Sequence, residues 1–301
     1  MMDFLRPEFS GYFEDRESLC RAHGLNPAKR MMLYISSFGY ASMDEDEVRQ
    51  LSDMAGTDFT EFAKVNREGM TETLAWFERY LEAHPEVELV YRRHPSEWSC
   101  PQLAALAEKR QNFHIIFSGS VKQWITAADT IGIWMSSAVA EVYFAGKTCH
   151  VLRPHPIPHE FDPVIYNDAR TVSSYEAFTA AMAAEDPPFP IAPAMIEAYF
   201  SHDAKTPAYV RMANLLEEVH KNPPRTEPFS AGYTPHFNWL KCFALVGVHI
   251  LFALRLNPAR FARVAPGFAS FAGRIYGYIE KAHLPKGEAE AMRQRIRRFV
   301  P

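Results

Sequence analysis

Short apolar runs alternate with longer amphipathic stretches over the first two thirds of the chain. The runs are continuous in apolar residues, as expected for strands buried on both faces. The longest stretch between them repeats apolar residues at helical spacing through Met70, Leu74, Phe77 and Leu81. We therefore expect helices between strands at Met31–Phe38, Val87–Arg92, Phe113–Ser118, Thr130–Met135 and His150–Leu152.

Strands that alternate with helices of this length are typical of βαβ units on a parallel sheet. The pattern changes after Asp186, where four prolines lead into a mainly helical region, and Pro223-Pro224 marks a linker. The sequence therefore predicts an α/β fold. Residues 1–222 would form a Rossmann-like parallel sheet with helices on both faces, and residues 223–301 a helical, basic C-terminal extension.

Polar residues follow every predicted strand at its carboxyl end, where open parallel sheets bind their ligands. Hydroxyls, guanidinium groups and the N–H groups of helix N-termini are suited to phosphate. We therefore expect a phosphate-bearing ligand at this edge. The candidate residues are Ser36, Ser37, Arg92, Arg93, His94, Ser118, Ser120, Ser136, Ser137, Arg153 and His155.

Two of these sites, His94 and the Ser136-Ser137 pair, and the nearby Glu141 allow a more specific interpretation. His94, stiffened by Pro95, can hold a phosphate or protonate a departing one, or it can belong to an ordinary strand-end turn. Ser136 and Ser137 precede a predicted helix, so they can cap it, face a ligand, or do both. Glu141, one helical turn beyond Ser137, can reach the hydroxyl pair of a ribose.

Several other sites are not expected. The stretch from Arg153 to Glu160 holds two histidines but also three prolines, which keep it extended, so we predict no metal site. No GxGxxG, Walker lysine loop or GxSxG elbow is present, which disfavours a nicotinamide, flavin or hydrolase site and predicts no bound cofactor. The four cysteines are widely spaced without a CxxC pair, as in a reducing cytoplasm.

Charge is distributed unevenly around a net value of −4. From Arg255 to Pro301 there are ten Lys and Arg against three Asp and Glu, which leaves about −11 for the rest. We expect either an anionic partner, a membrane before a nucleic acid, or a solvated basic helix. Trp239–Leu254 is apolar but interrupted by Lys241 and His249, so it predicts an interfacial anchor or a packing helix.

The segment from VYRRHPSEW through FHIIFSGSVKQWITAADTIGIWMSSAVAEVYFAGKTCHVLRP resembles the C-terminal domain of GT-B-fold glycosyltransferases. The resemblance covers roughly residues 3–175 and is nearest to bacterial surface carbohydrate biosynthesis proteins. The segment is also similar to teichoic-acid (CDP-glycerol) glycerophosphotransferases and to bacterial sialyltransferases with cytidine-linked donors. In those families a His-Pro pair and a Ser-Ser pair hold the donor phosphates. They match His94-Pro95 and Ser136-Ser137, while Glu141 and Gly146-Lys147 match an acid and GK segment that binds ribose.

This resemblance implies the donor-binding half of a glycosyltransferase of bacterial surface polysaccharide biosynthesis. Its partners would be a nucleotide-sugar, a glycan or lipid-linked acceptor and the inner-membrane surface, with no nucleic acid, in a cytoplasmic or peripheral membrane setting. The opening DFLRPEFSGYF resembles the stretch that links the two GT-B domains, so we expect the acceptor domain to be missing from this chain. The alternatives are a non-catalytic nucleotide-binding or scaffold module that docks a partner through its C-terminal helices, and a sugar-nucleotide epimerase.

Overall fold

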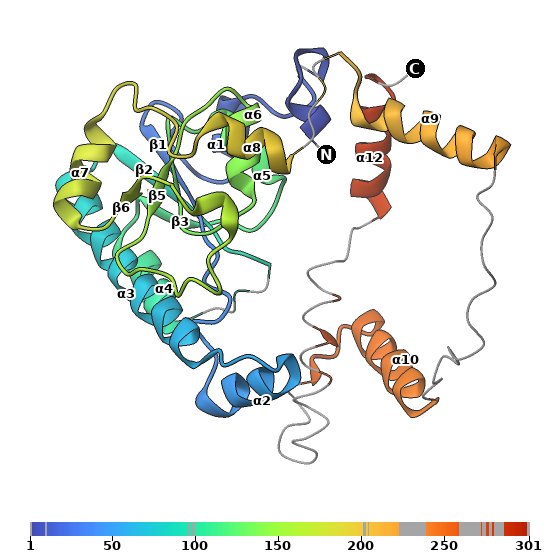
Figure 1. Cartoon of the computed structure of the whole chain (residues 1–301), viewed down its shortest axis with the longest axis horizontal. Helices are drawn as coiled ribbons and strands as arrows, with labels where there is room; N and C mark the ends of the chain where they lie inside the picture. Colours follow the sequence, from blue (N-terminus) through green and yellow to red (C-terminus); the bar gives the residue numbers. More distant parts are fainter. Residues whose placement is uncertain are drawn as a thin grey trace. The chain divides into compact units, whose positions relative to one another are not determined.

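The computed structural model describes residues 2–9, 11–95, 97, 100–200, 203, 205–222, 239–258, 272, 275–276, 279 and 286–299. Two compact units divide the chain, Met1–Met212 and Ala213–Pro301 (Figure 1). The first contains the whole sheet and the second is helical where it is described. The division falls inside one helix, α9 (Ala208–Lys221), ten residues before the domain boundary expected after residue 222.

A six-stranded, all-parallel sheet forms the centre of the first unit. Its strands lie in the order β3-β2-β1-β4-β5-β6, so the predicted α/β fold with a parallel sheet is confirmed. The chain builds outward from β1 in one direction and returns to the other side of β1 at β4. The strands are β1 (Arg30–Ile35), β2 (Val87–Arg92), β3 (Phe113–Ile115), β4 (Thr130–Ile133), β5 (His150–Leu152) and β6 (Thr171–Val172).

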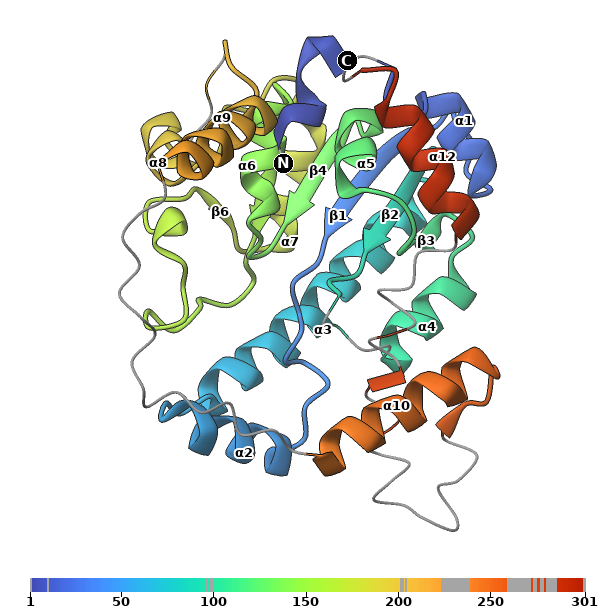
Figure 2. The same cartoon turned by 90° about the vertical axis from the view of Figure 1, so that its right-hand side faces the viewer.

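Helices cover both faces of this sheet (Figure 2). Alternate side chains of β1 point to opposite faces, Met31 and Leu33 into one apolar core and Met32 and Tyr34 into the other. The first core is completed by α1 (Arg16–Ala22), α5 (Val121–Ala127), α6 (Ala138–Phe144) and α8 (Pro193–Tyr199). The second is completed by α3 (Thr60–Ala83), α4 (Pro101–Lys109) and α7 (Tyr175–Ala183).

Local sequence signals set the bounds of several helices. The Asp44 carboxylate accepts the N–H of Glu47, whose side chain accepts the N–H of Asp44, and this capping box begins α2 (Glu45–Ala55). Gly56 ends α2 with a φ of +66°, a backbone conformation that favours glycine. Pro101 opens α4 in its first turn, where the missing N–H costs nothing.

Three of the observed strands, β1, β3 and β4, end earlier than the apolar runs that predicted them, whereas β2 and β5 have the predicted bounds. Ser36 to Phe38, Ile116 to Ser118 and Trp134 to Met135 leave the sheet, although half of these residues stay buried. Burial under covering loops therefore prolongs the apolar pattern beyond the strand itself. The two-residue strand β6 and helices α1 and α7 were not expected from the sequence.

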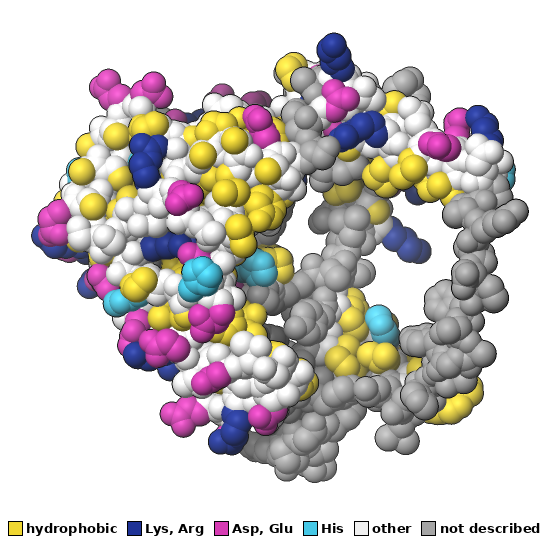
Figure 3. All heavy atoms as spheres, in the orientation of Figure 1, with side chains coloured by type: hydrophobic (Ala, Val, Ile, Leu, Met, Phe, Trp, Pro, Cys, Tyr) yellow, Lys and Arg dark blue, Asp and Glu magenta, His cyan; other side chains and the backbone are white. Residues whose placement is uncertain are grey.

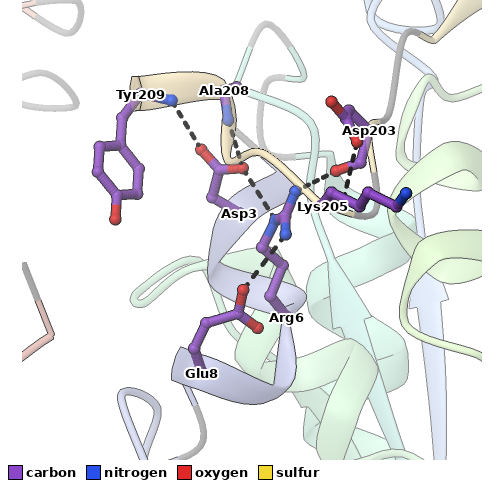
Figure 4. Close-up of polar contacts among 7 residues, drawn as sticks. All are labelled: Asp3, Arg6, Glu8, Asp203, Lys205, Ala208 and Tyr209. Carbon is purple, nitrogen blue, oxygen red and sulfur yellow. Dashed lines mark hydrogen bonds and ion pairs between the residues drawn. The ribbon is translucent and has the colours of Figure 1, made fainter. Parts of the chain in front are cut away.

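The N-terminal segment reaches across the first unit to the start of α9 (Figure 4). Asp3, in a short 3-10 helix (Met2–Leu5), is buried, and its carboxylate accepts the N–H groups of Ala208 and Tyr209 at 2.9 and 3.2 Å. The buried Arg6 bonds Asp3, Glu8 and the carbonyl oxygen of Asp203. A carboxylate at a helix N-terminus satisfies free N–H groups and the helix dipole, so these first residues belong to the fold of the first unit.

The second unit contains α10 (Trp239–Ala253) and α12 (Lys286–Ile296). Val248 of α10 is fully buried, and the ring of Phe252 packs edge-on against Tyr276 with centroids 5.2 Å apart. Among the described residues, no helix has the length and apolar character needed to cross a membrane.

Candidate functional site

The order of strands reverses between β1 and β4, which lie side by side. Ile35 pairs with Ile133 near the ends of the two strands, and just beyond them the rings of Phe38 and Trp134 lie 4.5 Å apart. The chain thus diverges to either side of this point, which is where open α/β sheets form a ligand crevice. The fold brings the Ser36-Ser37 and Ser136-Ser137 pairs to the ends of these two neighbouring strands.

Three polar side chains form a closed ring beside the end of β1. The Ser36 hydroxyl lies 2.5 Å from Oε2 of Glu97, and the Tyr91 hydroxyl lies 2.8 Å from both Ser36 Oγ and Glu97 Oε1. All three residues are buried, with Glu97 only 2% exposed. Each of the three contacts needs one proton, and the two hydroxyls supply only two. A protonated Glu97 supplies the third, so that every member donates once and accepts once.

Burial favours the same state of Glu97. Removal from water raises the pKa of this carboxyl above its ordinary value, although hydrogen bonds from Ser36 and Tyr91, the His94 amide and the charge of Arg93 act in the opposite direction. A small cavity of about 40 Å³ borders the carboxyl group. It is lined by Phe38, Ala41, Ser42, Arg67, Met70, Glu97, Cys100 and Gln102.

His94 is tied to this ring through its backbone. Its N–H points to Oε2 of Glu97 at 3.4 Å, and its carbonyl accepts the N–H of Glu97 at 2.9 Å, which closes a tight turn. His94 itself is exposed at the edge of the sheet. Arg93, half-buried next to it, places its guanidinium carbon 5.9 Å from the ring centroid of Phe117.

Arg92 holds the loop that follows β3. Its guanidinium group donates to the carbonyl oxygens of Ile116, Ser118 and Gly119 at 3.2, 2.5 and 2.8 Å. Burial lowers the pKa of Arg92 to about 10, which leaves it a cation at neutral pH. These three partners carry no negative charge, so the cation adds positive potential to the edge. The loop places Ser118 and Ser120 in exposed positions, and Ser120 Oγ also caps α5 by accepting the N–H of Lys122.

Ser136 and Ser137 lie between β4 and α6, as expected. Ser136 Oγ accepts the N–H of Ala138 at 3.2 Å, while the backbone of Ser136 exchanges two hydrogen bonds with the Tyr166 hydroxyl. Ser137 occupies the cap position of α6 without a capping hydrogen bond from its side chain, and it is exposed. Ser136 is therefore committed to local structure, whereas the Ser137 hydroxyl faces solvent.

Arg153 follows β5 and forms a two-point ion pair with Asp162 at 2.6 and 2.8 Å. Its guanidinium carbon also lies 4.8 Å from the ring centroid of Tyr166. A cavity of about 240 Å³ opens at this pair. Arg153, Pro154, Pro156, Ile157, Asp162, Thr171 and Ser173 line it. His155, expected beside Arg153 in the pocket, instead has its Nε2 2.9 Å from a Glu72 carboxylate oxygen of α3.

Glu141 is engaged by a lysine of the neighbouring helix. Lys122 Nζ of α5 lies 2.5 Å from Glu141 Oε1, and both side chains are largely buried. A ribose at this carboxylate would have to share it with Lys122. Among the described residues, His, Cys, Asp and Glu form no cluster suited to a metal ion.

Four residues that organise this edge were missed at the level of sequence: Tyr91, Glu97, Tyr166 and Asp162. The sequence predicts that Tyr91 belongs to a buried strand but indicates no hydrogen-bond partner for its hydroxyl. Glu97 and Asp162 lie in loops, where no periodicity marks a buried carboxylate. The only sequence signal for Glu97 is its spacing in HPSE. It lies three residues after His94, which is the separation of the first and last residues of a β-turn.

Comparison with known protein families and with curated proteins finds no match to this chain. The likeness to GT-B transferases therefore rests on the quoted sequence segments. The strand order and the edge chemistry described above are independent of it.

Proposed function

We propose that the carboxyl edge between β1 and β4 binds the phosphates of a nucleotide-sugar, and that the chain is the donor-binding half of a glycosyltransferase. The observation that carries this proposal is the reversal of strand order between β1 and β4, with a serine pair after each strand. A crevice at such a point is the usual ligand site of an open α/β sheet.

The charges at this edge support an anionic ligand. Arg92 keeps its charge while bonded only to carbonyl oxygens in the contacts described, and Arg93 and His94 follow it directly. A neutral Glu97 removes the negative charge that would otherwise lie beneath His94. The net potential is therefore positive where two phosphates would lie.

The proposed chemistry is electrostatic. When the bond between the sugar carbon and the donor phosphate breaks, the electron pair stays with the nucleotide, and negative charge grows on its terminal phosphate. His94 and Arg93 would stabilise that charge, and a protonated His94 could give its proton to the departing oxygen. The exposed hydroxyl of Ser137 would bond a phosphate oxygen. The acceptor's nucleophile would come from outside these groups.

Calorimetric titration of the full chain with CMP, CDP, UDP and GDP tests the proposal. We expect selective binding of one nucleotide, with at least tenfold weaker binding by His94→Ala, as for loss of one charged hydrogen bond of roughly 1.5–3 kcal/mol. His84→Ala is the matched control, because His84 ends α3 just before the amino end of β2. It should bind like the wild type.

Ser137→Asp gives a charge-specific version of the same test. The added carboxylate should weaken binding of the nucleotide but leave binding of the corresponding nucleoside unchanged, because only the nucleotide carries phosphate. Equal nucleotide binding by wild type, His94→Ala and Ser137→Asp would refute the assignment of this edge. Nucleotide binding without release of nucleotide from any sugar-linked donor and acceptor would favour the non-catalytic nucleotide-binding module.

A further inference from the structure

Helix α10 presents a row of large apolar side chains to solvent. Trp239, Phe243, Val246, Ile250 and Leu254 are 67%, 71%, 56%, 54% and 62% exposed. Because successive residues of an α-helix turn by about 100°, these five fall within an arc of roughly 80°. Figure 3 shows apolar side chains gathered on α10. We call this row the α10 stripe.

The opposite side of α10 is packed in part, although Leu245 on that side is 41% exposed. Val248, which points about 160° from the centre of the stripe by the same geometry, is fully buried. The ring of Phe252, on that side, contacts Tyr276. The helix therefore packs through Phe252 against Tyr276 of its own unit and exposes a second apolar face, which calls for an external partner.

Charge identifies the kind of partner. Residues 239–258 contain Lys241 and Arg255 but no Asp or Glu, and residues 239–285 contain six basic residues against one acidic residue. In the same unit residues 286–301, which include α12, contain five basic residues against two acidic ones. An apolar stripe in a cationic setting suits a surface that is anionic outside and apolar beneath, as an acidic lipid bilayer is.

Helix α9 supplies a contrast. It also exposes apolar side chains, namely Met212, Leu215, Leu216 and Val219. Its charged residues balance, however, since Glu217 and Glu218 are offset by Arg211 and Lys221. Exposure of apolar residues alone therefore does not distinguish the two helices, whereas net charge does, because it is zero on α9 and +2 over residues 239–258.

The length of α10 fixes how it would lie. Fifteen residues span about 22 Å, less than the roughly 30 Å of a bilayer core, so the helix would lie along the surface. Trp239 at one end is the residue type enriched at the boundary between headgroups and hydrocarbon. We propose that α10 docks the protein onto an anionic lipid surface through its stripe, a conclusion that does not depend on the nucleotide site.

Co-sedimentation of the full chain with lipid vesicles tests this. We expect binding to vesicles of equal phosphatidylglycerol and phosphatidylcholine, and little binding to phosphatidylcholine alone. The double variant Phe243→Asp/Ile250→Asp should bind at least roughly tenfold more weakly, because two carboxylates would enter the apolar layer. Both positions are exposed, so folding, checked by circular dichroism, should be kept.

The matched control is Met212→Asp/Leu216→Asp on α9, which changes two equally exposed apolar residues and should bind like the wild type. Salt raised from about 0.1 M to about 1 M shortens the screening length from about 10 Å to about 3 Å and should release part of the bound protein. The proposal is overturned if the wild type binds neither vesicle, or if both double variants lose binding equally. It is also overturned if the α10 variant changes the molecular mass in lipid-free solution while vesicle binding is kept, because the stripe would then join two copies of the chain.

Discussion

At the end of β1, Ser36 and Tyr91 hold the buried carboxyl of Glu97, and none of the contacts described for this carboxyl is with a cationic side chain. At the ends of β4 and β5 the same three kinds of residue occur, but there the carboxylate of Asp162 is bonded at two points by Arg153, and Tyr166 joins Arg153 to the Ser136 backbone. The two clusters lie on either side of the point where the strand order reverses.

The difference between them shows how partners decide charge. Burial favours the neutral form of Glu97, although the hydrogen bonds from Ser36 and Tyr91 act in the opposite direction. Arg153 bonds Asp162 at two points, and this ion pair is neutral as a whole. In both cases the edge loses negative charge, so the cations Arg92 and Arg93 set its potential. A single substitution in each cluster tests this difference.

The largest effect is expected from Asp162→Asn. The amide has nearly the shape of the carboxylate but leaves Arg153, which is 8% exposed, as an uncompensated buried cation. We expect a loss of about 3–5 kcal/mol in the free energy of unfolding, measured by urea denaturation. Arg153→Met combined with Asp162→Leu should recover much of it. A loss below about 1 kcal/mol for Asp162→Asn would mean that the pair behaves as an exposed one.

The two clusters also show which features could not be predicted from the sequence. The parallel sheet and its edge could be predicted because continuous apolar runs, turn residues and helical spacing repeat along the chain. The order of the strands could not be predicted, because the register of a strand and its neighbours in the sheet are set by tertiary contacts. The roles of Ser36 and Arg153 were expected to be contacts with a ligand. The structure gives both a structural partner in a loop, Glu97 and Asp162, which no local pattern marks.

The N-terminal residues teach the same lesson at longer range. DFLRPEFSGYF was interpreted as a linker by resemblance, yet Asp3 caps α9 across 205 residues of chain. A helix cap is normally sought just before the helix it serves, so a cap from a distant segment leaves no signal in a local window. By contrast, the capping box of α2 was readable because Asp44 and Glu47 are three residues apart.

A smaller effect is expected from the ring at β1. Glu97→Ala leaves the Tyr91 and Ser36 hydroxyls buried without their acceptor and should cost about 1–3 kcal/mol of unfolding free energy. Glu97→Gln should cost much less, because its amide can donate to Tyr91 while its carbonyl accepts from Ser36, as the protonated acid does. Glu108→Ala, an exposed change on α4, serves as control. A glutamine variant as unstable as the alanine variant would argue that Glu97 is ionised.

The smallest effect, and the sharpest test of the comparison, is the dependence of stability on pH. The pKa of Glu97 is raised in the folded chain, so its contribution to stability is fully present below the pKa of the unfolded state and is lost as pH rises through the folded pKa. Between about pH 5 and pH 7 the slope attributable to this group is at most about 1.4 kcal/mol per pH unit.

Glu97→Gln should remove that slope, and the difference between variant and wild type isolates Glu97 from its neighbours. Those neighbours are Arg93 and His94 on the same loop, Tyr91 on β2, Arg67 on α3 and Cys100 before α4. Urea midpoints measured across this range should therefore converge at the acid end and separate toward neutral pH, with the glutamine variant gaining. Parallel curves would show that Glu97 has the same protonation state in the folded and unfolded chain. The ring at β1 would then carry a negative charge at neutral pH.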